Sequence, residues 1–407
     1  MPDAGVPRLL TVSIGAPHPA RGASAVLFWH YVDAARRAGW RVRHIALDAA
    51  PDAAAEFAGS IEAPGSFEAE CFPDRAPIRE GLSGLSIDRS AIAPAISRAR
   101  EFAPDAILAF DMPAAWAFEA VRAPARIVWA GDLMFDVTRH HALYAAREDW
   151  RLWPHALLRL IVARNWRPVY ARVLGAASGV VASSASSVAK LSGLGVRAEF
   201  QPYPWPDPGA VPERAPPARP RFVFFGNLAA LGSRSALHFT FEAVIPRLRA
   251  IWGAGGFEIA FAGTGAIPAW AAPGFERAPE ASLLGFVPDL GGLLSHAHAA
   301  IAPIDVPVGN RSRILTALAY RVPVVAHANS ALGNPDLVDG ETCYLASDAE
   351  GFAARMRRVV EAPDEAERIA DAGRRAYEIN YAPPAACAKF VATLDRFKPA
   401  NREARAA

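Results

Sequence analysis

The sequence contains few cysteines and no long uncharged stretch. Cys71, Cys343 and Cys387 are widely separated and form no CxxC pair, which excludes a disulfide framework and a cysteine-based zinc site and favours a reducing compartment. Nowhere do about 18 or more uncharged apolar residues run together, so we expect no membrane-spanning helix. The N-terminus lacks a basic stretch followed by a long apolar core, and we expect no signal peptide. These absences predict a cytoplasmic protein, either soluble or bound peripherally to the inner membrane face.

The chain also has little net charge. Its formal charge is only +2, which argues against a protein that coats nucleic acid. Lysine occurs only at positions 190, 389 and 398, so almost every cation is an arginine. The first loop, with Gly15 and Gly22, lacks the compact GxGxxG motif, so a nicotinamide-binding fold has weak support. The small residues of that loop would instead let a ligand approach closely.

What the chain has in abundance is apolar sequence, arranged as two domains. With 407 residues, 52% of them hydrophobic, it is long enough for two cores. Between positions 201 and 220 there are eight prolines, a density that excludes helix and central strand and predicts a semi-rigid linker. The predicted parts are an N-terminal domain (1–200), the linker (201–220), a C-terminal domain (221–383), and a final helix with a polar tail (384–407).

Both domains repeat a pattern of apolar strand, glycine-containing loop and helix, which predicts α/β domains with parallel, doubly wound sheets. The expected strands of the first domain are 9–14, 41–47, 104–110, 126–132 and 179–184, with helices at 25–37, 92–102 and 113–121. The expected strands of the second domain are 221–227, 257–265, 283–290, 298–304, 322–325 and a short one near Tyr344, with a helix at 235–251 and mostly helix from 349 to 397. Residues 48–89 have weak periodicity and receive no assignment.

Three polar residues of the first domain follow expected strands. His18 lies between two prolines and is either a candidate base or a loop histidine in contact with water. Asp111 and Asp132 stand at the carboxyl ends of two strands, where carboxylates can face one cleft, although N-capping of the next helix is the commoner role for such an Asp.

Residues 139–172 interleave arginines with tryptophans and leucines. This mixture suits an amphipathic helix on an anionic membrane, which leaves open a peripheral membrane contact. Glu148 and Asp149 interrupt the positive face, however, so the alternative is an ordinary surface helix with its tryptophans turned inward.

The stretch GNRSRILTALAYRVPVV, residues 309–325, combines a turn, two cations, an apolar helix and a buried strand. Arg311 and Arg313 fall at the helix start, where unpaired N–H groups and the helix dipole favour an anion. Two guanidinium groups beside them would complete a phosphate site. The alternative is a pair of solvated arginines.

Over residues 221–380 the succession FFGNLA, AFAGTG, GFVPDL, GNRSRIL, YRVPVVA and VDGETCYLA resembles the donor lobe of the family 4 glycosyltransferases. The resemblance implies the GT-B architecture, in which two Rossmann-like lobes face each other across a cleft. It also implies that the loop at Gly285, Phe286 and Val287 holds the nucleotide base. The diphosphate would lie at Arg311 and Arg313. Other expected donor-binding residues are Gly22, Gly226, Asn227, Gly263, Gly265 and Thr316.

One departure from the family pattern concerns two missing carboxylates. Thr316 and Val308 occupy positions where relatives often carry Glu, and a threonine cannot make the charge-assisted contact of a carboxylate with a sugar hydroxyl. Of the cations often found after the first strand of this lobe, only Arg234 stands nearby. A non-catalytic protein that binds nucleotide sugars or glycans is therefore the alternative to an enzyme.

The resemblance implies transfer of a sugar from a nucleotide diphosphate sugar to a saccharide or lipid-linked acceptor, with retention of configuration, in cell-envelope or exopolysaccharide synthesis. Asp132 matches an acidic position of related first lobes, and His18 would be the base if the reaction inverted configuration. No DxD motif occurs, so we expect no metal and no cofactor besides the donor. Sugar epimerisation, a third possibility, would need an acid and base pair that the sequence does not show.

Overall fold

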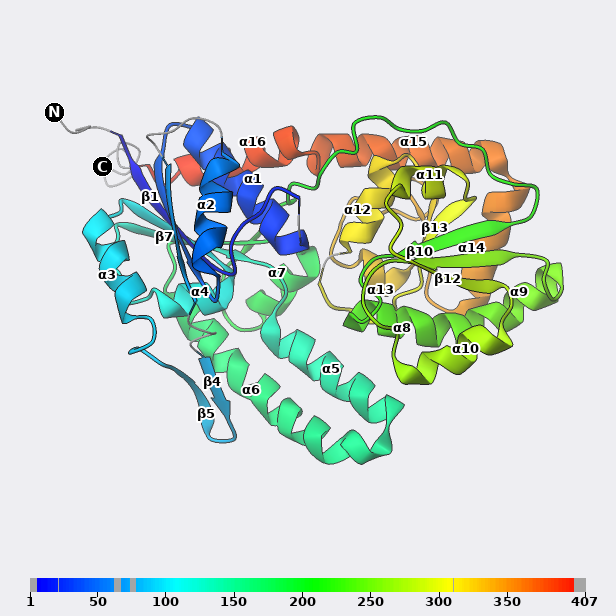
Figure 1. The fold of residues 1–407 in the computed structure, drawn as a ribbon, viewed down its shortest axis with the longest axis horizontal. Coiled ribbons are helices and arrows are strands. Elements are labelled where there is room, and N and C mark those ends of the chain that lie inside the picture. Colours follow the sequence, from blue (N-terminus) through cyan, green and yellow to red (C-terminus); the bar gives the residue numbers. More distant parts are fainter. Residues whose placement is uncertain (1–5, 21, 62–66, 74–77, 310, 399–407) are drawn as a thin grey trace. The chain divides into compact units, whose positions relative to one another are not determined.

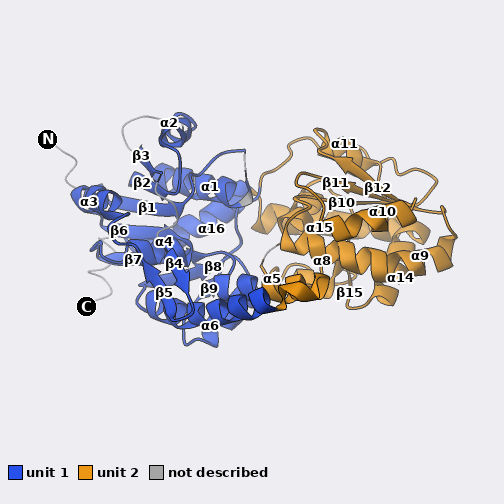
Figure 2. Ribbon diagram, turned by 60° about the horizontal axis from the view of Figure 1, so that its bottom comes forward, with its two compact units in different colours: residues 1–139, 154–205, 383–407 blue, residues 140–153, 206–382 orange. Residues whose placement is uncertain are grey.

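The chain folds into two compact units, each built on one parallel sheet. The structure is a computed structural model and describes residues 6–20, 22–61, 67–73, 78–309 and 311–398. One unit comprises residues 1–139, 154–205 and 383–407, and the other comprises residues 140–153 and 206–382 (Figure 2).

These units follow the predicted boundaries only in part. The proline-rich segment 201–220 contains no helix or strand, as predicted, and the division between the units falls inside it, after Trp205. The final helix α16 (Pro383–Asp395) belongs to the first unit, where it packs against α1 (Ala23–Arg37), with the rings of Phe390 and Tyr31 4.3 Å apart. Residues 399–407 of the predicted tail lie outside the described residues.

The first unit contains a seven-stranded sheet in the order β3-β2-β1-β6-β7-β8-β9, in which every pairing is parallel (Figure 1). Its strands are β1 (Arg8–Ile14), β2 (Arg41–Leu47), β3 (Phe67–Phe72), β6 (Ala106–Phe110), β7 (Ala125–Ala130), β8 (Gly179–Ala182) and β9 (Glu199–Phe200). All five residues of β6 are buried, as expected for a strand covered by helices on both faces.

Helices surround this sheet, and a small hairpin stands beside it. Besides α1 and α16 they are α2 (Pro51–Gly59), α3 (Ala93–Phe102), α4 (Asp111–Ala117), α5 (Met134–Glu148, which continues into the second unit), α6 (Trp153–Gly175) and α7 (Ala185–Ser192). The hairpin pairs β4 (Ile78–Gly81) with β5 (Gly84–Ile87). The elements α2, β3, β4 and β5 fall in the segment 48–89, to which the sequence pattern assigned no structure. None of the six residues of β3 is fully buried, so this edge strand lacks a clear apolar pattern.

The second unit contains a six-stranded parallel sheet in the order β12-β11-β10-β13-β14-β15. Its strands are β10 (Arg221–Phe225), β11 (Glu258–Ala262), β12 (Ala281–Gly285), β13 (Ala299–Ala302), β14 (Val324–His327) and β15 (Tyr344–Ala346). All six match predicted strands. The strand order reverses between β10 and β13, and in open α/β sheets ligands bind beyond the carboxyl ends of the strands at such a point.

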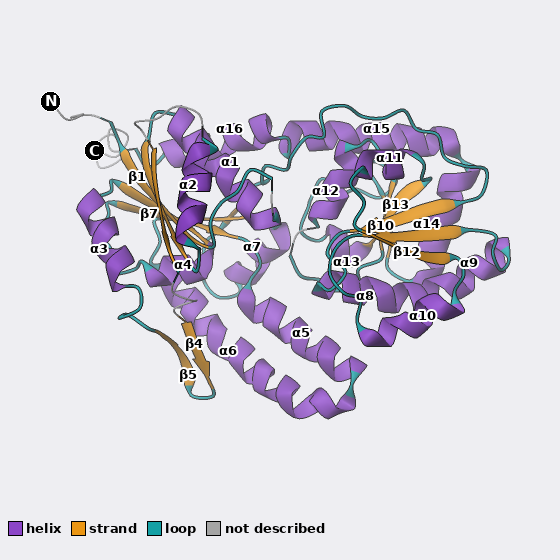
Figure 3. Cartoon of the chain, viewed as in Figure 1, coloured by secondary structure: helices purple, strands orange, loops and turns teal. Residues whose placement is uncertain are grey.

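The helices of the second unit include those predicted, one with a different length, and three short ones at Ala272–Arg277, Leu290–Ser295 and Ala328–Ala331 for which no range was predicted (Figure 3). They are α8 (Leu231–Phe239), a π-helical segment (Thr240–Val244), α9 (Ile245–Trp252), α10 (Ala272–Arg277), α11 (Leu290–Ser295), α12 (Ser312–Ala319), α13 (Ala328–Ala331), α14 (Ala349–Glu361) and α15 (Pro363–Asn380), with short 3-10 turns at Trp150–Leu152 and Ala269–Ala271. The helix predicted at 235–251 begins four residues earlier, at Leu231, and passes through the π-helical segment.

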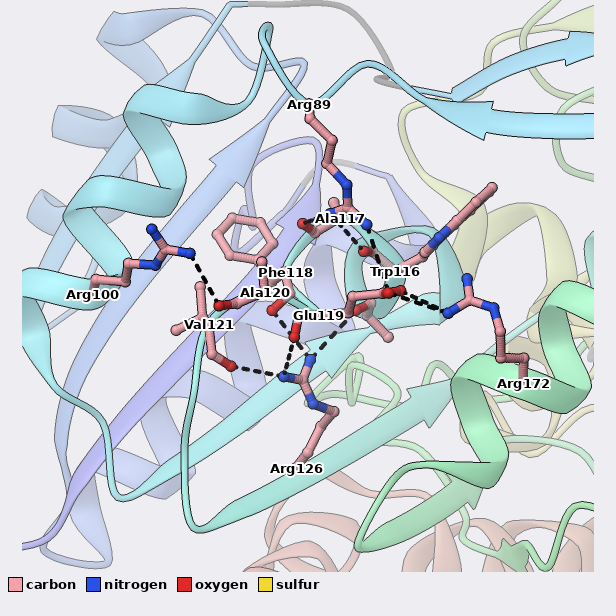
Figure 4. A network of polar contacts seen from close by, with 11 residues as sticks. Arg89, Arg100, Trp116, Ala117, Phe118, Glu119, Ala120, Val121, Arg126 and Arg172 are labelled. Atoms are coloured by element: carbon pink, nitrogen blue, oxygen red, sulfur yellow. Dashed lines mark hydrogen bonds and ion pairs between the residues drawn. The ribbon is translucent and has the colours of Figure 1, made fainter.

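Arginines hold the carboxyl end of α4 in the first unit. The Arg126 guanidinium donates hydrogen bonds to the carbonyls of Phe118 (3.2 Å) and Val121 (2.8 Å), and Arg89 donates to the carbonyl of Ala117 (3.1 Å). Figure 4 shows these side chains converging on the end of the helix. Cations stabilise the unpaired carbonyls of a helix C-terminus, so α4 is anchored at the end opposite Asp111, its first residue.

Candidate active site

Two glycine loops of the second unit touch at the point where the strand order reverses. Gly226 follows β10 with φ of 126°, and Gly263 follows β11 with φ of 145°. A Cβ atom on Gly263 would lie 1.8 Å from the carbonyl oxygen of Gly226, so only glycine allows this approach. Likewise, a Cβ atom on Gly265 would lie 2.6 Å from Oδ1 of Asn227, which accepts a hydrogen bond from the Ala229 N–H (3.0 Å). Four of the predicted donor-binding residues therefore lie together.

Arg313 reaches these loops from α12. A Cβ atom on Gly226 would lie 3.3 Å from the Nη2 atom of Arg313, so the guanidinium lies against that glycine. Its Cζ atom stands 4.5 Å from the centre of the Phe224 ring, and Nη2 donates to Oγ of Ser233 (3.1 Å). Arg313 forms no ion pair with a carboxylate in the described parts of the chain, and its buried Nη1 atom has no hydrogen-bond partner there. Burial, with a smaller contribution from the charge of Arg311, lowers the pKa of Arg313 to about 9.

A negative charge beside Arg313 would be favourable. Desolvating a cation without a paired negative charge is unfavourable, and an unmet donor adds the cost of a lost hydrogen bond. Arg311 is the N-cap residue of α12, and its Nη2 atom donates to the Val306 carbonyl (2.7 Å). Both arginines thus stand at the start of the helix, as the sequence predicts, beside N–H groups that suit a phosphate. Asn310, between the predicted turn and the helix, lies outside the described residues.

Sequence reasoning missed two residues that position Arg313. Ser233 is fully buried, and besides accepting from Arg313 it donates to the Asn227 carbonyl (2.6 Å), which ties the β10 loop to α8. Phe224 supplies the ring face under the guanidinium. Only the run of small residues after β10 hints at such packing in the sequence. Arg234, the other nearby cation, forms an ion pair with the Glu148 carboxylate, which is 4% exposed, and so is engaged elsewhere.

The positions of the missing carboxylates have no acidic substitute on α12. The Thr316 hydroxyl donates to the Ser312 carbonyl one turn earlier (3.1 Å), and Val308 is a buried apolar residue. The loop predicted to hold the base follows β12, where the Gly285 carbonyl accepts from the Gly263 N–H (2.7 Å). Phe286 in that loop is 70% exposed and Val287 is half-buried, so an apolar ring face is open to solvent one residue beyond the glycine contact.

In the first unit the structure brings Asp111 to the end of β7. Asp111 adopts a left-handed backbone with φ of 68°, and its Oδ1 atom accepts a hydrogen bond from the Gly131 N–H (2.6 Å). The capping interpretation of Asp111 is wrong, because Phe110 is the N-cap residue of α4 and no side chain caps that helix. Burial first, and then the neighbouring charge of Asp132, raises the pKa of Asp111 to about 7 although the Gly131 hydrogen bond opposes this. Asp132 itself is exposed.

This pKa makes the stability of the fold depend on pH. Between about pH 4 and about pH 7 the folded chain keeps a proton on Asp111 that the unfolded chain has released. The free energy of unfolding should therefore fall as pH rises through this window and level off above it. Asp111→Asn removes the titration. Relative to this variant, the wild type should therefore lose a few kcal/mol of unfolding free energy between about pH 5 and about pH 8, measured by urea unfolding at both values. Identical pH dependence of the two proteins would contradict the assignment.

His18 and Gly22 lie in the loop before α1. The Nδ1 atom of His18 accepts from the Ala20 N–H (2.9 Å), and Nε2 lies 3.0 Å from Oε1 of Glu56. Since a backbone N–H can only donate, Nδ1 carries no proton and Nε2 donates to the carboxylate. Both ring nitrogens are thus engaged, and His18 would have to exchange a partner to act as a base. Gly22 is the N-cap residue of α1, with φ of 74°.

The tryptophans between 139 and 172 do not share one environment. Trp166 is 2% exposed and donates to Glu80 (3.2 Å), whereas Trp150 and Trp153 are 74% and 50% exposed. The interpretation with all tryptophans turned inward is therefore wrong for two of the three. Across the described part of the chain, no helix combines the length and apolar character needed to cross a bilayer. The described residues also contain no group of three or more His, Cys, Asp or Glu side chains suited to a metal.

Comparison with known proteins agrees with this geometry. Residues 219–362 match the family model described as Glycosyl transferases group 1. These residues lie within the second unit. The match covers the β10 and β11 loops and α12, and it confirms the enzyme class predicted from the sequence, a glycosyltransferase. No curated protein matches the chain.

Solved structures show the same fold over nearly the whole chain. A sucrose-phosphate synthase from Thermosynechococcus elongatus is similar with a TM-score of 0.66 and 14% identity, covering 96% of this chain and 98% of that one. Alr3699/HepE from Anabaena, solved in complex with UDP, is similar with a TM-score of 0.65 and 14% identity, covering 95% of this chain and 99% of that one. A mutant of TarM from S. aureus was solved in complex with fondaparinux, alpha-GlcNAc-glycerol and UDP. It is similar with a TM-score of 0.62 and 8% identity, covering 94% of this chain and 99% of that one. These likenesses confirm the predicted GT-B fold.

Proposed function

We propose that this protein transfers a sugar from a nucleotide diphosphate sugar to a saccharide or lipid-linked acceptor. The observation that carries the proposal is Arg313, a desolvated guanidinium that has an unmet donor, lies beside two glycine loops and pairs with no carboxylate of the described chain. A diphosphate would supply the missing negative charge, and its charge grows as the sugar leaves. Stabilising that leaving group is the main electrostatic task in such a transfer. The UDP in the solved HepE and TarM structures supports a nucleotide as donor carrier.

The test is a thermal shift screen with nucleoside diphosphates. A ligand that binds only the folded chain stabilises it by mass action, by about 2.7 kcal/mol at a concentration of 100 times its Kd. One diphosphate, such as UDP or GDP, should raise the melting temperature by several degrees, and the matching monophosphate should raise it less. Equal shifts with monophosphate and diphosphate, or no shift with any base, would contradict a diphosphate site.

Metal independence belongs to the same proposal. Two arginines and the N–H groups of α12 would do the work that a divalent ion does beside an acidic motif. We therefore expect turnover to be unchanged after treatment with EDTA and unaffected by added manganese. Activity that disappears with the chelator and returns with manganese would refute this part of the proposal.

A substitution at Thr316 tests whether this position of α12 corresponds to the Glu position of the family 4 glycosyltransferases. A carboxylate at this position of α12 would reach the donor as in related enzymes, and a charge-assisted hydrogen bond is worth about tenfold or more in affinity. Thr316→Glu should therefore raise donor turnover about tenfold. Thr316→Gln is the control, because it has the same length without the charge. A Glu variant no better than the Gln variant would show that the position does not face the donor.

A second candidate function is favoured by the absence of both carboxylates. With Val308 buried and the Thr316 hydroxyl donating to its own helix, the chain would bind a nucleotide sugar without turning it over. Calorimetric binding of a diphosphate, combined with no release of free sugar or product across a donor panel, would favour this candidate.

The finer parts of the proposal concern the stereochemistry of the transfer, its pathway and its location in the cell. We propose retention of configuration, with His18 as base only if NMR shows an inverted product. We also place the reaction in cell-envelope or exopolysaccharide synthesis, at the cytoplasmic side of the inner membrane. The exposed Trp150 and Trp153 support a peripheral membrane contact, since indole rings favour the bilayer interface.

A further inference from the structure

The first unit contains a basic pocket that has no part in the donor site. Its volume is about 500 Å³, and three helices line it: α5 through Phe135, Asp136 and Arg139, α6 through Arg164 and Arg167, and α7 through Lys190. We infer that this pocket binds a phosphate ester. The inference goes beyond the proposed function, because no residue of the second unit lines the pocket.

The charges in the pocket are not balanced by the chain. Asp136 is the only carboxylate that lines it, and it forms an ion pair with Lys190. Arg139, Arg164 and Arg167 pair with no carboxylate anywhere in the part of the chain that the structure describes. All three side chains are exposed, so solvent screens part of their mutual repulsion, and a bound anion would remove the rest.

Other arginines of α6 do pair with carboxylates, so the lack of a carboxylate partner is specific to the arginines at the pocket. Arg159 pairs with Glu80 (2.9 Å) on the β4–β5 hairpin, and Arg172 pairs with Glu119 (3.1 Å) at the end of α4. Arg164 and Arg167 lie between them in sequence but turn to the pocket. The guanidinium of Arg167 also stands 5.9 Å from the centre of the Phe135 ring, which restricts its motion.

The chemistry of these groups selects phosphate. A guanidinium presents a planar fork of donors that matches phosphate oxygens, and several such forks can hold one phosphate from different sides. The pocket is also large enough for the group that the phosphate is attached to. Arginine clusters on separate helices are therefore better suited to a phosphate ester than to a neutral sugar.

Apolar residues beside the pocket indicate what the ester carries. Leu157 and Ile161 lie seven and three residues before Arg164 on α6, a spacing that places them on the same face. Their side chains are 55% and 42% exposed. A phosphate attached to an apolar group would contact both parts of this face. Such a phosphate comes either from a lipid headgroup in a bilayer or from a soluble phosphorylated molecule.

The two sources are distinguished with probes and variants that need no donor. The first arm measures co-sedimentation of the full chain with vesicles of phosphatidylcholine alone and with added phosphatidylglycerol. The second arm measures binding of glycerol phosphate by calorimetry. The test variant is R164Q/R167Q, and the control is Arg122→Gln, another exposed arginine of the first unit that does not line the pocket. Thermal melting of each variant confirms that it is folded.

We expect the wild type and the Arg122 control to bind alike, and R164Q/R167Q to bind about tenfold or more weakly. Loss in the vesicle arm alone assigns the pocket to a lipid headgroup, and L157S/I161S should then weaken vesicle binding too. Loss in the glycerol phosphate arm alone assigns it to a soluble phosphate ester. Wild type that binds neither probe, or R164Q/R167Q that binds as well as the wild type, overturns the inference. Because neither arm uses a nucleotide, failure here leaves the proposed sugar transfer untouched, and only a wild type that binds no vesicles would also count against the proposed membrane contact.

Discussion

Replacing Arg313 with Gln is expected to weaken nucleoside diphosphate binding by about 100-fold, because a charge-assisted contact in a desolvated site is lost. The guanidinium is held by Ser233, the Phe224 ring and the Gly226 backbone, none of which neutralises it. Its charge therefore remains for the ligand that we propose. Calorimetry with the diphosphate that stabilises the wild type provides the measurement.

Two controls separate charge from packing in this experiment. Arg313→Lys keeps the charge and loses the planar fork, so it should recover only part of the affinity. Arg247→Gln removes an exposed arginine of α9 in the second unit, whose guanidinium donates to the Ala243 carbonyl (2.8 Å), and should bind as the wild type does. Arg313→Gln that binds the diphosphate as well as the wild type would show that this arginine is a structural cation.

The second large effect is expected for Gly263→Ala. The new Cβ atom would lie 1.8 Å from the carbonyl oxygen of Gly226 on a backbone with φ of 145°, which alanine rarely adopts. The two loops must move apart, so we expect the free energy of unfolding to drop by about 4 kcal/mol and diphosphate binding to be lost. Urea unfolding measures the first effect and calorimetry the second.

Gly253→Ala is the matched control for this variant. Gly253 also has a positive φ, 78°, but a Cβ atom there would have nothing within 4 Å. With ψ of 166° this backbone is also one that alanine rarely adopts, so the replacement should cost about 2 kcal/mol from strain alone and leave diphosphate binding intact. Equal destabilisation by the two substitutions would show that the contact between the loops contributes nothing beyond strain.

The sheets and the arginine pair could be predicted because their signals are local. Each strand of the second unit is a short apolar run ended by glycine, proline or a polar residue, and the cations of α12 follow a turn directly. The same holds for the strands of the first unit from β6 to β8. Local pattern failed at β3, where no residue is fully buried, and at the β4–β5 hairpin, whose four-residue strands contribute only Ile78, Leu85 and Ile87 to the apolar core.

The details of the site depend on contacts between distant residues and could not be predicted. Ser233 meets Arg313 across 80 positions of sequence, and Arg234 pairs with Glu148 across 86. Asp111 looked like a helix cap because an Asp between a strand and a helix usually is one. Its left-handed backbone turns the carboxylate to Gly131 on the neighbouring strand end instead, and a single sequence carries no sign of that.

The central claim is that this protein turns over a nucleotide diphosphate sugar at the site containing Arg313. The most direct test measures nucleoside diphosphate release from a panel of nucleotide sugars by the wild type and by Arg313→Gln. The account predicts that the wild type consumes one donor, and that the variant does so about 100-fold more slowly. Diphosphate binding without turnover of any donor, or equal turnover by the two proteins, would contradict it.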